Sequence, residues 1–160
     1  VDWEGELGVV IGRGGFRVAE EEALAHIFGY TIANDISARD LQDAEPQWLR
    51  AKSMDTSCPL GPCVVTADAI PDPQALHVRT YVSGQKMQDG VTSSMFFKIG
   101  YLVAYLSRSF ALLPGDLILT GTPAGVGKGM KPPRFLQAGD VVRVEIDGIG
   151  ALENPCWYWD

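Results

Sequence analysis

Two glutamates near the start of the chain, Glu4 and Glu6, are separated by one glycine and lead into an apolar, β-branched run at 7–11. Side chains along a strand repeat their direction every two residues, so both carboxylates face the same side. Like charges held this close repel each other unless a proton or a cation lies between them. Taken alone, the pair fits either a cation site or two solvated acids on an edge strand.

A third carboxylate, Asp35, follows in a segment that otherwise has the apolar character of a strand. A buried aspartate needs a partner, because an unpaired charge is costly inside a protein. Three carboxylates suit a hard divalent cation, Mg²⁺ first and Mn²⁺ or Ca²⁺ as alternatives. The sequence therefore predicts a metal site built from Glu4, Glu6 and Asp35. In such a site the ion polarises a carbonyl group and stabilises an enolate.

Three polar residues after Asp35 could donate hydrogen bonds beside this cation. If the chain becomes helical after Asp35, Arg39 and Gln42 share one face of that helix. Lys52 follows, just before a loop rich in proline and glycine. A guanidinium, an amide and an ammonium group would stabilise a developing oxyanion, and Lys52 is the best candidate for proton transfer. The alternative is that all three are solvated polar side chains on the surface of the protein.

The glycine-rich segment 120–129 invites comparison with a phosphate-binding loop. However, Thr122 stands where such a loop needs its first glycine, and Gly129 stands where it needs serine or threonine. No nucleotide site is therefore predicted, although the amides and hydroxyls of the segment could receive a carboxylate. His26 and His77 have no acid or nucleophile at a telling spacing, so we interpret both as packing residues.

The elements that position these side chains are mostly strands joined by short turns. Alternation and β-branched residues predict strands over 7–11, 31–36, 63–66, 77–82, 85–88, 116–120, 141–146 and 151–152. Helices are predicted over 20–28, with Gly29 as the C-cap, and over 95–106. Too few helices alternate with strands for a doubly wound parallel sheet. We therefore expect residues 1–160 to form one mixed, β-rich domain, a β-sandwich or roll with a few short covering helices.

The composition excludes several classes of function. The 160 residues carry 20 acidic and 13 basic side chains, a net charge of -7, which disfavours binding to nucleic acid. No apolar run approaches the ~20 residues of a membrane span, so no membrane association is expected. The three cysteines lack the further pair that a zinc site needs, and we expect reduced thiols in a cytoplasmic protein.

Four motifs, occurring in order over nearly the whole chain, resemble the fumarylacetoacetate hydrolase family. They are Glu4-Gly-Glu-Leu-Gly-Val-Val-Ile, Gly29-Tyr-Thr-Ile-Ala-Asn-Asp-Ile-Ser-Ala-Arg-Asp-Leu-Gln42, Lys52-Ser-Met-Asp-Thr and Pro114-Gly-Asp-Leu-Ile-Leu-Thr-Gly-Thr-Pro-Ala-Gly-Val-Gly. The resemblance implies a mixed β-sandwich roll, a homodimer, and a Mg²⁺, Mn²⁺ or Ca²⁺ ion on the carboxylates already named. It also implies that Arg39, Gln42 and Lys52 contact the oxygens of the substrate and that the loop around Thr122 closes on its carboxylate.

Members of this family cleave carbon–carbon bonds in acylpyruvates and β-diketones, and others decarboxylate or tautomerise oxo-acids. The resemblance therefore implies a metal-dependent enzyme acting on a small oxo-acid. Because the segment that begins at Lys52 is more similar to the hydrolase-like branch, we expect hydrolysis of a carbon–carbon bond in an acylpyruvate or β-diketo acid. The alternatives are an isomerase, tautomerase or decarboxylase of the aromatic-catabolism type, and a non-catalytic module that binds oxo-acids.

The chain departs from the family pattern in two places. Family members have a further N-terminal segment, with a His/Glu pair on a mobile lid that positions the attacking water. Neither His26 nor His77 replaces that pair in this sequence. The chain also has Val91 where the family often has an asparagine, so the substrate contact made by that asparagine is not expected here. The choice between hydrolysis and its alternatives therefore depends on the lid segment.

Overall fold

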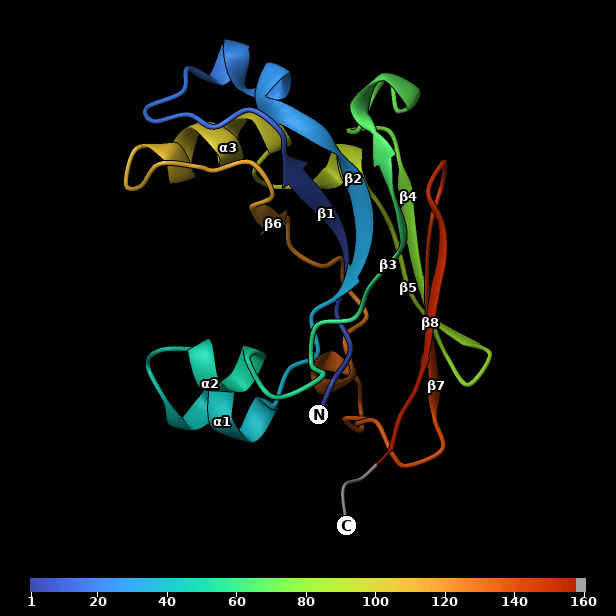
Figure 1. The fold of residues 1–160 in the computed structure, drawn as a ribbon. Helices are drawn as coiled ribbons and strands as arrows, with labels where there is room; N and C mark the ends of the chain where they lie inside the picture. The colour runs from blue at the N-terminus through green and yellow to red at the C-terminus, as the bar shows by residue number, and fades with distance from the viewer. Residues whose placement is uncertain (158–160) are drawn as a thin grey trace.

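The computed structural model describes residues 1–157, which form two four-stranded antiparallel sheets packed against each other (Figure 1). The first sheet has the order β3-β2-β1-β6, and the second has the order β5-β4-β7-β8. The strands of the first sheet are β1 (Gly5–Ile11), β2 (Ile27–Asn34), β3 (Leu60–Thr66) and β6 (Leu117–Leu119). Those of the second sheet are β4 (His77–Val82), β5 (Gln85–Val91), β7 (Val141–Ile146) and β8 (Gly150–Pro155).

Short helices lie at the two ends of the first sheet (Figure 1). The helices α1 (Arg39–Ala44) and α2 (Leu49–Lys52) contact each other near the start of β1. The helix α3 (Ile99–Ser107) packs on the 3₁₀ helix η1 (Glu20–His26) at the opposite end. Three single-turn 3₁₀ helices complete the description: η2 (Ala67–Ala69), η3 (Thr92–Ser94) and η4 (Gly127–Gly129). Within residues 1–157, no helix has the length and apolar character needed to cross a membrane.

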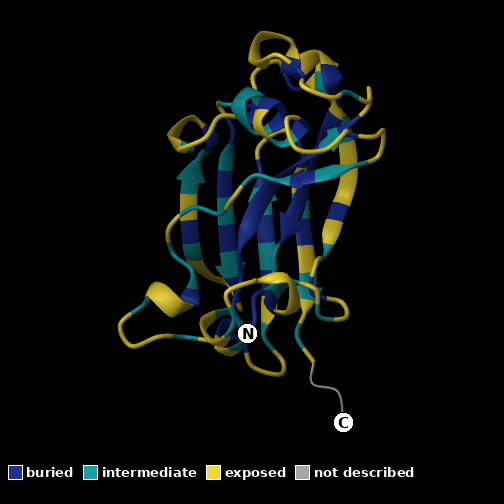
Figure 2. Ribbon diagram, turned by 90° about the vertical axis from the view of Figure 1, so that its left-hand side faces the viewer, coloured by how far each residue is buried: buried dark blue, intermediate teal, exposed yellow. Residues whose placement is uncertain are grey.

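The core lies between the two sheets, where the strands are darkest in Figure 2. Alternate residues of β4 and β7 are buried, as period-two strands with one inward face require. Each fully buried Val, Leu or Ile side chain contributes roughly 1.5–3 kcal/mol to folding. The strand β1 is buried along both of its faces, so the side of β1 that carries Glu4 and Glu6 is also shielded from bulk water.

The second sheet packs tightly against β1 at Gly5, between the two glutamates. A Cβ atom on Gly5 would lie 2.2 Å from Thr80 Oγ1 and 2.9 Å from Val144 Cγ1. Both distances are shorter than ordinary van der Waals contacts, so no side chain fits at this position without movement of the neighbouring strands. The backbone between Glu4 and Glu6 therefore rests directly on the opposite sheet.

The fold confirms the predicted β-rich sandwich with short helices, and β4 and β7 have their predicted bounds. The predicted C-cap at Gly29 is wrong, because η1 ends at His26 and Gly29 lies inside β2, opposite Val10 and Thr66. The predicted helix over 95–106 begins later, at Ile99, because its first residues form a loop that leaves Phe96 exposed. Asp35 is also not inside a strand: β2 ends at Asn34, and Asp35 is only partly buried.

Candidate functional site

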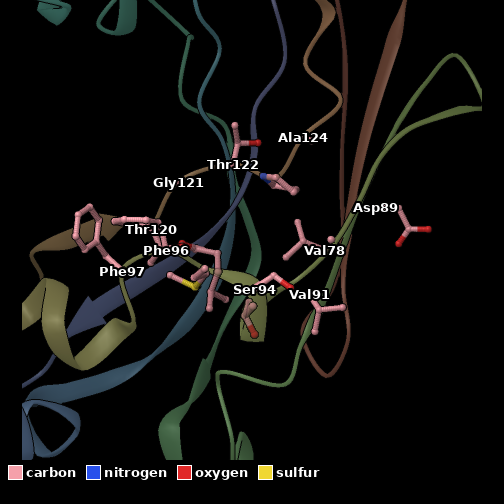
Figure 3. Close-up of a pocket in the computed structure, with 15 residues that line it drawn as sticks. Val78, Asp89, Val91, Ser94, Phe96, Phe97, Thr120, Gly121, Thr122 and Ala124 are labelled. Carbon is pink, nitrogen blue, oxygen red and sulfur yellow. The ribbon is translucent and has the colours of Figure 1, made fainter. Parts of the chain in front are cut away.

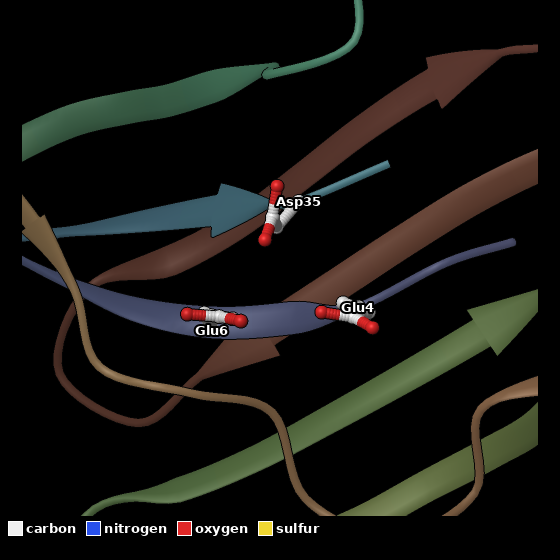
Figure 4. Close-up of side chains that lie close together, drawn as sticks. All are labelled: Glu4, Glu6 and Asp35. Atoms are coloured by element: carbon white, nitrogen blue, oxygen red, sulfur yellow. The ribbon is translucent and has the colours of Figure 1, made fainter. Parts of the chain in front are cut away.

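Glu4, Glu6 and Asp35 meet where β1 begins and β2 ends (Figure 4). The two strands are antiparallel with Gly5 opposite Asn34, so the next residue, Asp35, comes alongside Glu4. The Asp35 amide donates a hydrogen bond to the Glu4 carbonyl oxygen at 2.9 Å. One carboxylate oxygen from each residue lies within 4.8 Å of the other two. The structure thus brings together the three residues that the sequence predicts as metal ligands.

The most buried of these carboxylates is Glu6, which is 3% exposed. The Gly121 amide donates a hydrogen bond to Glu6 Oε2 at 2.7 Å. Burial raises the pKa of Glu6 to about 7; the bond from Gly121 opposes this rise, and the neighbouring charges of Asp35 and Glu4 add to it. Without a cation, Glu6 therefore holds a proton up to near-neutral pH.

Lys52 places a positive charge against the other two carboxylates. Its Nζ atom, at the end of α2, lies 2.7 Å from Glu4 Oε2 and 2.6 Å from Asp35 Oδ2. Burial alone would lower the pKa of Lys52, but the hydrogen bonds to Asp35 and Glu4 outweigh it, so the pKa is raised. The Asp35 pKa is also raised, because burial outweighs the effect of Lys52. Lys52 is therefore a protonated ammonium group in this arrangement.

Arg39 approaches the cluster from α1, on the other side of Glu4. Arg39 Nη1 lies 2.7 Å from Glu4 Oε1 and donates to Gln42 Oε1 at 2.9 Å. This contact confirms that Arg39 and Gln42 share one face of a helix that begins after Asp35. The third guanidinium nitrogen, Nη2, is buried and has no hydrogen-bond partner among residues 1–157. Arg39 therefore keeps unused donors that an anionic ligand could accept.

Thr122 lies beside β1 rather than among the carboxylates. Its hydroxyl donates to the Gly5 carbonyl oxygen at 2.9 Å and accepts from Gln88 Nε2 at 2.7 Å. The segment from Thr120 to Thr122 thus runs along the part of β1 that the short strand β6 leaves unpaired. Both hydrogen bonds of the Thr122 hydroxyl are therefore made within the protein. The predicted contact of Thr122 with a substrate carboxylate stays a prediction.

Two buried polar residues beside the cluster were missed in the sequence. Gln88 is fully buried on β5 and receives a hydrogen bond from the Gly5 amide at 3.0 Å, across the sandwich. Asp2 is also fully buried and lies 2.8 Å from Arg39 Nε. The two-residue spacing of Glu4 and Glu6 continues back to Asp2, so the sequence could have predicted that Asp2 lies on the same face as the two glutamates. No pattern around Gln88 indicates its contacts, since they join segments 83 residues apart.

The donor set fits a divalent cation. The three side chains offer only carboxylate oxygens, the ligands that Mg²⁺, Mn²⁺ and Ca²⁺ prefer. Burial first, and then the charges of Asp35 and Glu4, raise the pKa of Glu6, and a bound cation would oppose both effects by replacing the proton with a positive charge.

A separate cavity of about 610 Å³ is lined in part by the loop around Gly121 (Figure 3). Leu7, which alternates with Glu6 along β1, and Phe96 and Phe97 contribute to its wall. Among residues 1–157, no lysine, arginine or histidine lines this cavity, so these residues offer no cation to an oxo-acid there. The carboxylate cluster, with Arg39 and Lys52 beside it, is therefore the better candidate for the functional site.

The chain is similar to known proteins over nearly its whole described length. The family model described as the fumarylacetoacetate (FAA) hydrolase C-terminal domain matches residues 1–156. Two curated relatives are the mitochondrial oxaloacetate tautomerase fahd2 of Xenopus laevis, 53% identical over 97% of this chain, and the oxaloacetate tautomerase YisK of Bacillus subtilis, 51% identical over 96%. The chain spans about half the length of these relatives, 49% and 51%.

Among solved structures, a fumarylacetoacetate hydrolase from Exiguobacterium antarcticum superposes with a TM-score of 0.95. It is 49% identical, and the match covers 98% of this chain and 56% of that protein. This likeness extends over both sheets and the short helices, because it includes nearly every residue of the chain.

Proposed function

This chain belongs to the fumarylacetoacetate hydrolase family, and from that premise we propose that it forms the cation-binding and oxo-acid-binding part of a keto–enol tautomerase. Its substrate would be a small 2-oxo acid of the oxaloacetate kind, held on a divalent cation at Glu4, Glu6 and Asp35. The observation that carries this proposal is the meeting of three carboxylates with Lys52 and Arg39 in one shielded cluster.

The relatives support tautomerisation better than the hydrolysis expected from the sequence. Two curated relatives, 53% and 51% identical to this chain, are named oxaloacetate tautomerases. Tautomerisation also needs no attacking water, and therefore no lid residue to position one. The isomerase or tautomerase alternative thus becomes the main proposal, and carbon–carbon bond hydrolysis becomes the second candidate.

In the proposed reaction the chain's own residues bind the acid and move a proton. Keto–enol exchange transfers one proton between the carbon next to the carbonyl and the carbonyl oxygen. When bound, the divalent cation would polarise that carbonyl and make the neighbouring C–H more acidic. Lys52 Nζ has three protons, of which two are donated to Glu4 and Asp35. The third would pass to the substrate carbon, and the proton leaving the enol oxygen would return to Nζ, so that the ammonium is restored.

Arg39 and Gln42 would bind and orient the acid rather than move protons. The buried Nη2 group of Arg39, which lacks a partner among the described residues, can donate to a carboxylate or enolate oxygen. Gln42 accepts from Arg39 through Oε1, which leaves its amide N–H groups to face a ligand. Both side chains project from the same face of α1, so they would contact the substrate together.

Hydrolysis remains the second candidate because one observation favours it. The solved structure with the TM-score of 0.95 is named a fumarylacetoacetate hydrolase, and it shares 49% identity with this chain. Hydrolysis would use the same carboxylates and the same donors, with water added to the acyl carbon before the carbon–carbon bond breaks.

A single set of assays separates these activities. The protein, freed of metal with EDTA, would be supplied with Mg²⁺ or Mn²⁺ and mixed with enol-oxaloacetate or an acylpyruvate. We expect cation-dependent loss of the enol absorbance of oxaloacetate without release of CO₂. Release of pyruvate from the acylpyruvate would favour hydrolysis, CO₂ would favour decarboxylation, and cation-dependent binding without turnover would favour a binding module.

Two variants locate the activity in the cluster. Glu6→Ala is expected to abolish the dependence on the cation, and Lys52→Met is expected to abolish proton transfer. Lys128→Met is the matched control, since Lys128 pairs with exposed Asp43 and contacts no carboxylate of the cluster. Unchanged turnover in Glu6→Ala would refute the proposed site.

Three further expectations from the sequence stay proposals. They are that residues 1–160 form one catalytic domain, that the protein is a homodimer, and that it acts in the cytoplasm.

A further inference from the structure

We propose that Asp2 is a positioning residue of the cation site, acting on Glu4 through Arg39. Asp2 lies outside the three proposed ligands and outside the groups proposed to contact the acid. The proposal rests on the proposed function only in assuming that the carboxylate cluster binds a divalent cation.

The carboxylate of Asp2 is fully buried and joins three segments of the chain. Its Oδ1 atom accepts from the amides of Trp3 at 2.9 Å and Gly127 at 2.7 Å. Its Oδ2 atom accepts from the Lys128 amide at 2.9 Å and from Arg39 Nε at 2.8 Å. Four donors satisfy both oxygens, which is what allows a carboxylate to remain buried without exposure to water.

These bonds fix the guanidinium group of Arg39 relative to β1. Arg39 Nε is held by Asp2, while Nη1 lies 2.7 Å from Glu4 Oε1. Because the guanidinium is planar and rigid, fixing Nε also fixes the direction of Nη1. Arg39 therefore holds one oxygen of Glu4 and leaves the other, Oε2, directed to Lys52 and the cluster.

The backbone supports the same arrangement. Asp2 and Ser37 exchange two main-chain hydrogen bonds, at 2.9 and 3.0 Å, which extend the pairing of β1 and β2 past the cluster. The glycine-rich loop packs closely against the Asp2 carboxylate. A Cβ atom on Gly127 would lie 2.9 Å from Asp2 Oδ1. Asp2 thus connects the start of β1, the start of α1 and this loop.

Loss of this connection is expected to weaken cation binding without removing a ligand. In Asp2→Asn, an amide N–H₂ replaces one oxygen and faces the N–H donors of Arg39 or Lys128. Arg39 then has Glu4 as its remaining carboxylate partner, so it competes more strongly with a cation for Glu4. Residues that orient metal ligands from behind typically change affinity by about 10- to 100-fold.

The test measures Mn²⁺ affinity by titration calorimetry in the wild type, Asp2→Asn, Arg39→Lys and the double variant. We expect about tenfold weaker binding in each single variant, and no further loss in the double variant, because both changes break the same connection. Urea unfolding in EDTA, measured in parallel, reports the stability of each variant. Asp140→Asn is the control, since Asp140 also accepts a loop amide, from Gln137, but lies in a turn outside the cluster.

Several results would overturn the inference. Wild-type Mn²⁺ affinity in Asp2→Asn would do so, as would equal losses that add in the double variant. If Asp2→Asn does not fold, Arg39→Lys carries the test, because it keeps the charge and breaks the planar fork; wild-type affinity there also overturns the inference. A wild type that binds no Mn²⁺ refutes the cation site itself, whereas one that binds Mn²⁺ without turnover refutes only the proposed function.

Discussion

Replacing Glu6 by glutamine should stabilise the metal-free protein at alkaline pH. Glutamine has nearly the same shape, accepts the hydrogen bond from Gly121 and carries no charge at any pH. The pKa of Glu6 rises from 4.5 to about 7 on folding, a difference of roughly 2.5 units. At 1.36 kcal/mol per unit, ionising Glu6 lowers the free energy of unfolding by about 3 kcal/mol once the pH exceeds both values.

The direction of the effect follows from proton binding. Between pH 4.5 and about 7, the folded state holds the Glu6 proton more tightly than the unfolded state does. Stability of the wild type therefore falls as the pH rises through this range and then levels off. In Glu6→Gln this fall is absent, so the two proteins are expected to be equally stable near pH 4.5, with the variant about 3 kcal/mol more stable at pH 8.

Urea unfolding followed by tryptophan fluorescence, in EDTA at pH 5, 6, 7 and 8, measures this difference. Added Mn²⁺ is expected to raise the unfolding midpoint of the wild type and to leave that of Glu6→Gln nearly unchanged. Glu153→Gln, an exposed glutamate on β8, is the control and is expected to show no such pH dependence. A variant that is no more stable than wild type at pH 8, or is stabilised equally at every pH, would refute the reasoning.

Three further outcomes are expected. Gly5→Ala is expected to lower the free energy of unfolding by about 1–3 kcal/mol, because the added methyl group would contact Thr80 Oγ1. Calorimetry should show that a Gly5→Ala/Thr80→Ala double variant recovers part of this loss. Wild-type stability in Gly5→Ala would contradict the close packing. Gln88→Leu is expected to lower the free energy of unfolding by about 1–3 kcal/mol, because the Gly5 amide and the Thr122 hydroxyl lose a buried hydrogen-bond partner. Urea unfolding measures this loss, and an unchanged stability would count against the role of Gln88. Lys52→Met is expected to lose turnover and to bind Mn²⁺ several-fold more tightly in calorimetry, because the Lys52 ammonium group no longer competes with the cation for Glu4. Weaker binding would contradict this competition.

The strands of the second sheet were predictable because their patterns are local. Inward-facing Val78, Thr80 and Val82 alternate with less buried residues, so β4 was recovered with its bounds. Gly29 was misread because a glycine after a short acidic segment resembles a helix end, and only its pairing with β1 and β3 reveals a strand. Phe96 was assigned to a helix by its spacing, although it lies in the loop before α3.

The site was predictable in part for the same reason. Glu4 and Glu6 are related by a strand period, and Asp35 is marked as a charge in an apolar segment. The ion pair between Lys52 and Asp35 spans 17 positions, and it depends on the turn between α1 and α2, which no spacing rule describes. Gln88 meets Gly5 only after the two sheets pack, so its role required the folded structure.

The contact between Gln88 and Gly5 has a consequence for how the protein opens in solution. The Gly5 amide, between the two glutamates, donates a hydrogen bond to a side chain of the opposite sheet. We expect this bond to break only when the two sheets separate. Hydrogen exchange of the Gly5 amide with solvent is therefore expected to proceed through global unfolding and to be among the slowest in the chain. A cation would then enter and leave by rearrangement of side chains such as Lys52, over a backbone that does not open locally.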